Sequence, residues 1–102
     1  MKNNAPVDSK AKVLLIVTET LRRTYADNDL VGEVGAETRL IGQAAVLDSL
    51  QLVSFIVDVE SEVSAGFACS VALADEKAMS REKSPFRSVE TLVDYVVELL
   101  GA

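Results

Sequence analysis

The sequence contains no histidine and only one cysteine, so two common kinds of functional site are missing from it. Without histidine the chain lacks the commonest general base and the commonest neutral metal ligand of proteins. One cysteine cannot form a disulfide within the chain. The sequence also lacks a metal-ligand cluster, a phosphate-binding glycine loop and a nucleophile elbow. These absences predict that the chain is not an enzyme and holds no metal of its own.

Basic residues are also scarce. The chain has 10 lysines and arginines against 16 aspartates and glutamates, which gives a net charge of −6. A nucleic-acid-binding protein normally presents a basic face to the phosphates, so DNA and RNA are excluded as main partners. An acidic domain instead suits partners with basic surfaces, because opposite potentials speed and orient docking.

Long hydrophobic runs are missing as well. The longest, Val13 to Val17, is far too short to span a bilayer, and residues 1–9 lack the apolar stretch of a secretory signal. We therefore expect no membrane span and a cytoplasmic location. With 49% hydrophobic residues, the chain suits one compact domain. We expect a monomer in which residues 1–8 form a flexible lead and residues 9–102 form the single domain.

Periodic apolar residues predict an all-α fold. The predicted helices cover residues 10–24, 48–63, 75–80 and 89–100. Their expected capping residues are Asp8 or Ser9 for the first helix, Asp48 or Ser49 for the second and Ser88 for the last. Glycines break regular structure between residues 25 and 48, while leucines and valines there indicate a loop packed on the body. The sequence therefore predicts a small four-helix bundle with a long loop between helices 1 and 2.

The second predicted helix has two apolar sides. At 100° per residue, the side expected to face the core holds Leu52, Phe55, Ile56, Val59 and Val63. Leu50, Val53 and Val57 form a further stripe at the edge of the polar face. The helix therefore has more apolar circumference than one core contact requires. The further stripe is either a docking surface for partners or additional core against the long loop, and the sequence leaves both open.

Ser49 stands at the expected start of this helix. Serine is a weak nucleophile unless a base activates it, and the solvated carboxylate of Asp48 is a poor base for an alcohol. If Ser49 is modified, a second enzyme must supply the activation. Unpaired N–H groups and the helix dipole favour an anion here, so a phosphodiester on Ser49 would be stabilised. A simple helix cap is the competing interpretation.

Two long segments carry a family resemblance. The first is Thr38-Arg39-Leu40-Ile41-Gly42 followed by Val46-Leu47-Asp48-Ser49-Leu50-Gln51-Leu52-Val53-Ser54-Phe55-Ile56. The second is Phe86-Arg87-Ser88-Val89-Glu90-Thr91-Leu92-Val93-Asp94-Tyr95-Val96. Together they resemble the loop, second helix and last helix of acyl carrier proteins, and the resemblance extends from about Lys10 to Leu100. The run around Ser49 is its most specific part.

The resemblance implies a four-helix carrier whose Ser49 hydroxyl receives 4'-phosphopantetheine from coenzyme A. A phosphopantetheinyl transferase makes this attachment with Mg²⁺, and in such carriers the residue at the position of Asp48 helps bind the metal during transfer. The thiol of the arm then holds acyl groups as thioesters for acyl-loading and acyl-processing enzymes. The resemblance also implies that these enzymes dock on Leu50, Val53, Val57, Asp58 and Glu60.

Some residues depart from the carriers of fatty-acid synthesis. Gln51 and Ser54 are neutral where those carriers commonly have acids, and the stretch over residues 64–87 is longer than in the short members of the family. These departures favour a specialised carrier, in fatty-acid-like, lipid or secondary-metabolite biosynthesis. The cargo stays open between fatty acyl, aminoacyl and polyketide-type groups. The alternative function is a protein-interaction module of the same fold that carries no cargo.

Overall fold

The computed structural model describes residues 6–42, 45–68, 70–73 and 86–101. This part of the chain forms three helices, α1 (Pro6–Asp27), α2 (Ser49–Phe67) and α4 (Val89–Leu99), and contains no β-strand. The predicted all-α class is therefore confirmed for the described residues. The short helix expected over residues 75–80 lies outside them.

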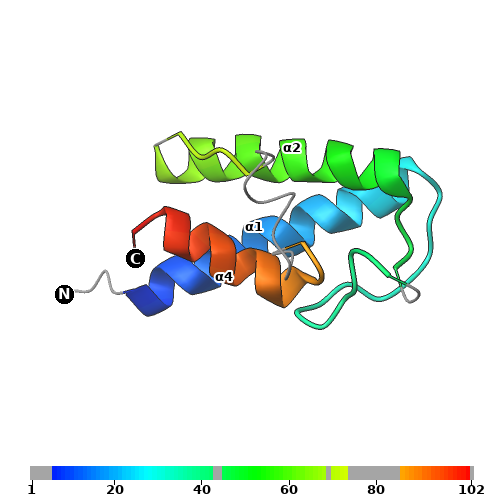
Figure 1. The fold of residues 1–102 in the computed structure, drawn as a ribbon, viewed down its shortest axis with the longest axis horizontal. Helices are drawn as coiled ribbons and strands as arrows, with labels where there is room; N and C mark the ends of the chain where they lie inside the picture. Colours follow the sequence, from blue (N-terminus) through cyan, green and yellow to red (C-terminus); the bar gives the residue numbers. More distant parts are fainter. Residues whose placement is uncertain (1–5, 43–44, 69, 74–85, 102) are drawn as a thin grey trace.

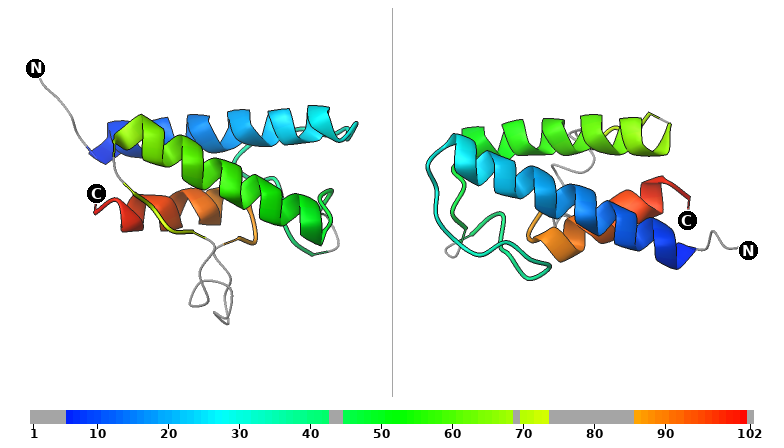
Figure 2. Two further views of the ribbon diagram at one scale, coloured as in Figure 1. Left: turned by 90° about the horizontal axis from the view of Figure 1, so that it is seen from above. Right: turned by 180° about the vertical axis from the view of Figure 1, so that it is seen from behind.

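α1 is the central helix of the bundle. It packs against both α2 and α4, and both of these helices run in the opposite direction to α1 (Figure 1, Figure 2). The chain leaves α1 at the same end of the bundle at which α2 begins. The long connection therefore covers one end of the bundle and positions the start of α2.

Apolar side chains of all three helices fill one core. Its helical members are Val13, Val17, Leu21, Tyr25, Phe55, Ile56, Val59, Val63, Val89, Leu92, Val93, Tyr95 and Val96. The connecting segments contribute Leu40, Leu47, Val71, Leu73 and Phe86. The predicted core side of α2 is confirmed, although Leu52 is only partly buried. Full burial of a large apolar side chain contributes about 1.5–3 kcal/mol, so this core is the main source of stability.

α1 begins earlier than the sequence predicts. It starts at Pro6, whereas the expected start is Lys10. Proline is favoured at the first helical position, because its ring presets the helical φ and its missing N–H would have no partner there. The expected lead of residues 1–8 is therefore helical from Pro6 onward, and Asp8 and Ser9 lie inside α1 instead of capping it.

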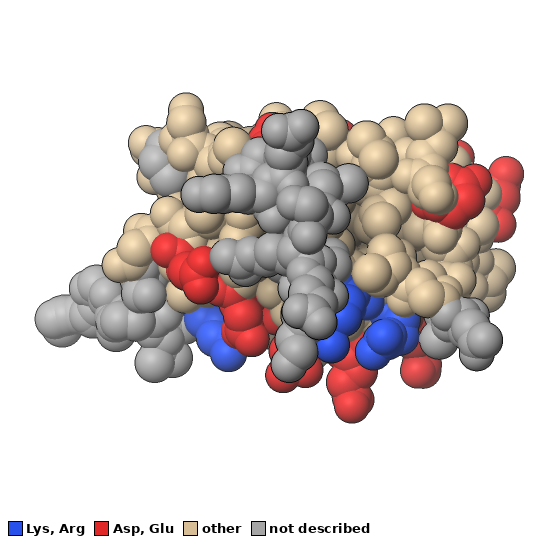
Figure 3. All heavy atoms as spheres, in the orientation of Figure 1, with Lys and Arg blue, Asp and Glu red and all other residues tan. Residues whose placement is uncertain are grey.

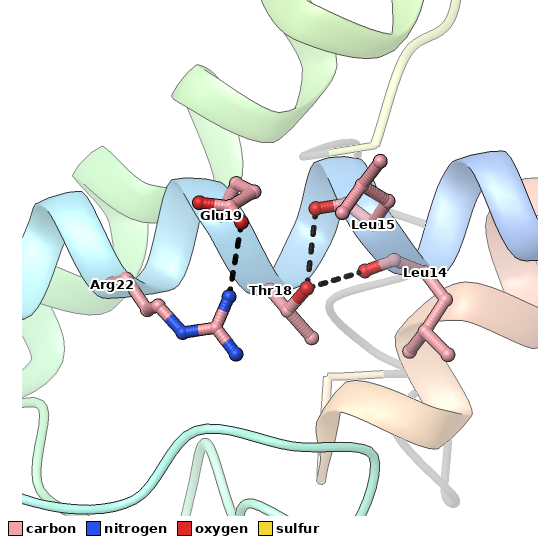
Figure 4. Close-up of polar contacts among 5 residues, drawn as sticks. All are labelled: Leu14, Leu15, Thr18, Glu19 and Arg22. Atoms are coloured by element: carbon pink, nitrogen blue, oxygen red, sulfur yellow. Dashed lines mark hydrogen bonds and ion pairs between the residues drawn. The ribbon is translucent and has the colours of Figure 1, made fainter.

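The buried face of α1 also carries a hydroxyl group that the backbone of the helix satisfies. Thr18 is buried, and its Oγ1 lies 2.9 Å from the carbonyl oxygen of Leu14 and 3.1 Å from that of Leu15 (Figure 4). Thr18 therefore brings no unsatisfied donor into the bundle.

On the exposed side, Arg22 and Glu19 form an ion pair at 3.1 Å, which contributes at most about 1 kcal/mol.

Backbone hydrogen bonds join the long loop to the start of α4. The N–H of Val89 donates to the carbonyl oxygen of Thr38 at 3.0 Å. The N–H of Glu90 donates to the carbonyl oxygen of Ala36 at 2.9 Å. Both donors lie in the first turn of a helix, where they have no intrahelical partner. With Leu40 also buried, the loop is packed on the body as predicted.

Candidate functional site

Asp48 is the N-cap of α2. Its Oδ1 accepts a hydrogen bond from the backbone N–H of Gln51 at 2.8 Å, and the Oε1 of Gln51 accepts one from the backbone N–H of Asp48 at 3.0 Å. This reciprocal arrangement is a capping box, which satisfies two backbone donors at once. Of the two capping residues that the sequence left open, the structure selects Asp48.

Ser49 is the first residue of α2, so its hydroxyl is not used as the cap. The side chain is exposed, and within the described part of the chain its Oγ has no hydrogen-bond partner. The first turn of α2 contains no acidic residue. An accessible hydroxyl therefore meets the positive end of the helix dipole, an arrangement that suits the attachment of an anionic group.

A hollow of about 290 Å³ lies beside Ser49, between the long loop and the first turns of α2. Its lining residues are Leu40, Ile41, Gly42, Ala45, Leu47, Asp48, Ser49 and Leu52. Leu47 and Leu52 occupy the two positions of a hydrophobic staple, which fixes the angle at which the chain enters the helix. Gly42 has a φ of +96°, a conformation that side chains other than glycine's rarely adopt. The loop therefore forms one wall of this hollow next to the Ser49 hydroxyl, with both apolar and polar groups.

The further apolar stripe of α2 lies outside the core. Leu50 is 77% exposed, Val53 47% and Val57 48%. The sequence left this stripe open between docking surface and additional core, and its exposure removes the second reading for the described structure. A partner that covered the part of these side chains that still faces water would gain the corresponding apolar burial. We call Leu50, Val53 and Val57 the docking stripe, after the role that the sequence predicts for them.

The acidic residues of α2 differ in what they contact. The Oε2 of Glu60 accepts a hydrogen bond from the backbone N–H of Leu73 at 2.7 Å, which ties the chain after α2 back to the helix. Glu62 pairs with Arg23 of α1 at 3.5 Å. Asp58 is exposed. Of the two acids expected to contact partners, Asp58 is thus accessible, while Glu60 already has an intramolecular partner.

The described residues contain no group of three or more potential metal ligands. Asp48 is a single carboxylate next to Ser49, and Mg²⁺ is commonly bound by one or two carboxylates together with substrate phosphates. A metal at this position would therefore take its remaining ligands from a phosphate-containing substrate and from the enzyme that supplies it. The carboxylate of Asp48 could supply one ligand to a metal that is shared with such a substrate.

A wider and more open hollow of about 720 Å³ lies between Arg22 and residues 32–38. Its basic group is Arg22, which already pairs with Glu19. The Thr38 hydroxyl in its wall accepts a hydrogen bond from the Gly35 N–H at 2.8 Å. Burial raises the pKa of Tyr25 above its usual value, and Tyr25 lines neither hollow. The hydroxyl of Thr38 and the guanidinium of Arg22 are thus both engaged within the chain, unlike the Ser49 hydroxyl.

Comparisons with protein-family models, with curated proteins and with solved structures find no match to this chain. Among the described helices, none is long and apolar enough to cross a membrane.

Proposed function

We propose that this chain is an acyl carrier protein that carries acyl groups on a 4'-phosphopantetheine arm attached to Ser49. The observation that carries the proposal is the position of Ser49. Its hydroxyl is exposed at the first residue of a helix, beside a capping carboxylate and in front of a solvent-exposed apolar stripe. A hydroxyl that serves only as a cap would instead accept a first-turn N–H, and Asp48 already does so.

The attachment is a transfer of a phosphoryl-linked group to the Ser49 oxygen. A bond forms between Oγ and phosphorus, the pyrophosphate bond of coenzyme A breaks, and adenosine 3',5'-bisphosphate leaves. The hydroxyl proton goes to a base of the transferase, because this chain has no histidine and Asp48 is engaged in the capping box. Once attached, the arm supplies a terminal thiol on which acyl groups are held as thioesters.

The start of α2 stabilises the product of this transfer. A phosphodiester at an exposed helix N-terminus gains about 0.3–1 kcal/mol from the dipole and the free N–H groups. Like-charge repulsion from Asp48 opposes this gain, but one of its oxygens is already held by the Gln51 N–H. The neutral side chain of Gln51 adds no further repulsion. The first turn thus tolerates a permanent anion on Ser49.

Intact mass spectrometry tests the proposed function directly. Incubation of the chain with coenzyme A, Mg²⁺ and a broad-specificity phosphopantetheinyl transferase is expected to add one cofactor mass. Peptide mapping is expected to place this mass on Ser49. A chain that stays unmodified with several such transferases, or that is modified at another residue, contradicts the proposal.

Replacing Asp48 by asparagine separates its role as a cap from its role in transfer. Asparagine caps a helix about as well as aspartate, so the free energy of unfolding is expected to change by less than about 0.5 kcal/mol. The transferase rate is expected to fall about tenfold or more, because a hydrogen bond to a charged group contributes about 1.5–3 kcal/mol. The measurements are kcat/KM for the transferase and urea denaturation.

Gln51→Ala is the matched control for this experiment. It removes the Gln51 half of the capping box but keeps the Asp48 carboxylate, so it should lower stability by about 0.5–1 kcal/mol and preserve modification. If the Asp48→Asn chain is modified as fast as the wild-type chain, the carboxylate of Asp48 has no part in the transfer.

The exposed docking stripe also supports a second candidate, a protein-interaction module of the same fold that carries no cargo. This candidate requires the stripe but not the Ser49 hydroxyl.

The cargo of a carrier could be a fatty acyl, aminoacyl or polyketide-type group. The intact mass of the protein purified from its own cell would identify it.

A further inference from the structure

The hollow beside Ser49 has walls that are held in place by the rest of the fold. Leu40 is buried in the core, and its N–H donates to the carbonyl oxygen of Arg87 at 2.8 Å. The N–H of Ala45 donates to the carbonyl oxygen of Gly42 at 3.1 Å, which joins two of the lining residues. The hollow is therefore formed before any ligand arrives, as is usual for small-molecule pockets.

Part of the apolar lining of this hollow still faces solvent. Ile41, Ala45 and Leu52 line it and are each only partly buried. A ligand that covered them would remove apolar surface from water, which is favourable. The polar side chains of the lining are those of Asp48 and Ser49. The hollow thus combines apolar walls with a few polar groups, the usual composition of a small-molecule site.

The lining of the hollow contains one charged side chain, that of Asp48. In Figure 3, mostly uncharged atoms of the described residues lie between the start of α2, at the upper right, and the charged side chains along the lower edge. A charged group placed against apolar walls loses hydration without gaining a partner. The segment that these walls suit is therefore neutral and apolar.

We propose that the hollow binds the part of the 4'-phosphopantetheine arm nearest to Ser49, the branched segment in which one carbon carries two methyl groups. This inference rests on the proposed carrier function and names the place where the arm lies. A single CH₂ group separates the branched carbon from the phosphodiester, so its methyl groups stay close to the Ser49 oxygen. Because Ser49 itself lines the hollow, attachment brings these methyl groups to the walls formed by Ile41 and Leu52.

Covalent attachment makes a small site sufficient. A ligand on a short tether is present at a high effective concentration, so weak apolar contacts are enough to hold it. With about 290 Å³, the hollow lies at the lower limit of small-molecule pockets, which occupy about 300–1,000 Å³. It therefore suits a short branched segment better than a long acyl chain, which is the competing occupant.

NMR spectroscopy of the chain before and after attachment of the arm tests the proposal. In the modified chain, isotope-filtered NOEs are expected between the arm methyl groups and the side-chain methyl groups of Ile41 and Leu52. The changes in amide chemical shift should also reach Ile41, beyond the immediate neighbours of Ser49. NOEs from the arm methyl groups to Leu50 or Val53 instead, or no NOEs to the chain, overturn the proposal while leaving the carrier function in place.

Two substitutions in the lining provide the second measurement. Ala45→Leu places a larger side chain at the hollow, and Ile41→Ser removes part of its apolar wall. Both are expected to abolish the NOEs from the arm methyl groups to Leu52, while intact mass still shows attachment. Val31→Ser is the matched control, because Val31 is an apolar residue of the same loop that is 91% exposed and lines neither hollow. Circular dichroism checks that the helices are retained, and unchanged NOEs in both lining variants overturn the proposal.

The remaining outcomes are distinct. A chain that no transferase modifies removes the carrier function and this inference together. If NOEs to Ile41 and Leu52 arise only after a long acyl group is loaded on the thiol, and come from that group, the hollow belongs to the cargo and the proposal is overturned.

Discussion

The Ser49→Ala chain is expected to fold normally and to accept no phosphopantetheine. Ser49 does not cap α2, because Asp48 and Gln51 form the capping box by themselves. Alanine is the best helix former, so the free energy of unfolding should change by less than about 0.5 kcal/mol. Modification should be lost completely, since the substitution removes the oxygen that forms the bond to phosphorus. Intact mass after incubation with coenzyme A and the transferase measures the loss.

Ser54→Ala is the control for this result. Ser54 is another exposed serine of α2, so its replacement changes the same surface by the same atom and should leave the mass gain intact. Addition of the cofactor to the Ser49→Ala chain would contradict the assignment. The same variant separates the two candidate functions, because an interaction module without cargo keeps its activity without the Ser49 hydroxyl.

Phe55→Ala is expected to cause the largest loss of stability among single substitutions in α2. Phe55 is the largest of the fully buried side chains in the described structure. Removal of a buried phenylalanine typically costs about 3–5 kcal/mol, because the lost transfer energy adds to the cost of a cavity. Domains of this size have a total stability of about 5–15 kcal/mol, so the loss removes a large share of it and should lower the denaturation midpoint clearly. Urea denaturation followed by circular dichroism measures the change.

Leu50→Ala is the control for the core substitution. Leu50 is 77% exposed in the same helix, and its truncation should change the free energy of unfolding by no more than about 0.5 kcal/mol. Similar losses for the two variants would mean that the docking stripe is covered in the folded chain. That outcome would also argue against a partner surface on α2.

Local sequence patterns predicted the parts of the fold that depend on neighbours in the chain. Ser88 was expected to cap the last helix, and its Oγ accepts the Thr91 N–H at 3.3 Å in a capping box. The apolar spacing of α2 identified its core side because a helix repeats every 3.6 residues. The capping box of α2 could also have been predicted from the sequence, since Asp48 and Gln51 have its characteristic spacing of three residues.

Other features depend on residues that are distant in the sequence. The hydrogen bond from the Leu73 N–H to Glu60 joins positions 13 residues apart, and no local sequence pattern predicts it. The pairing of Glu62 with Arg23 requires α1 and α2 to lie side by side. The exposure of the docking stripe is likewise a result of packing, because helical periodicity gives the angle between two faces but not which neighbour covers each one.

The sequence alone determined that the chain has no histidine, and it predicted the all-helical class that the described residues confirm, because both follow from residue type and short-range spacing. It also predicted Ser49 as the position that is modified. The tertiary structure decided that Asp48 and not Ser49 caps α2, that the docking stripe faces solvent, and that Glu60 and Glu62 are held by partners within the chain. The physical reason is the same in each case. A side chain's availability to a partner depends on what the folded chain has already placed against it, and that is settled only when the helices pack.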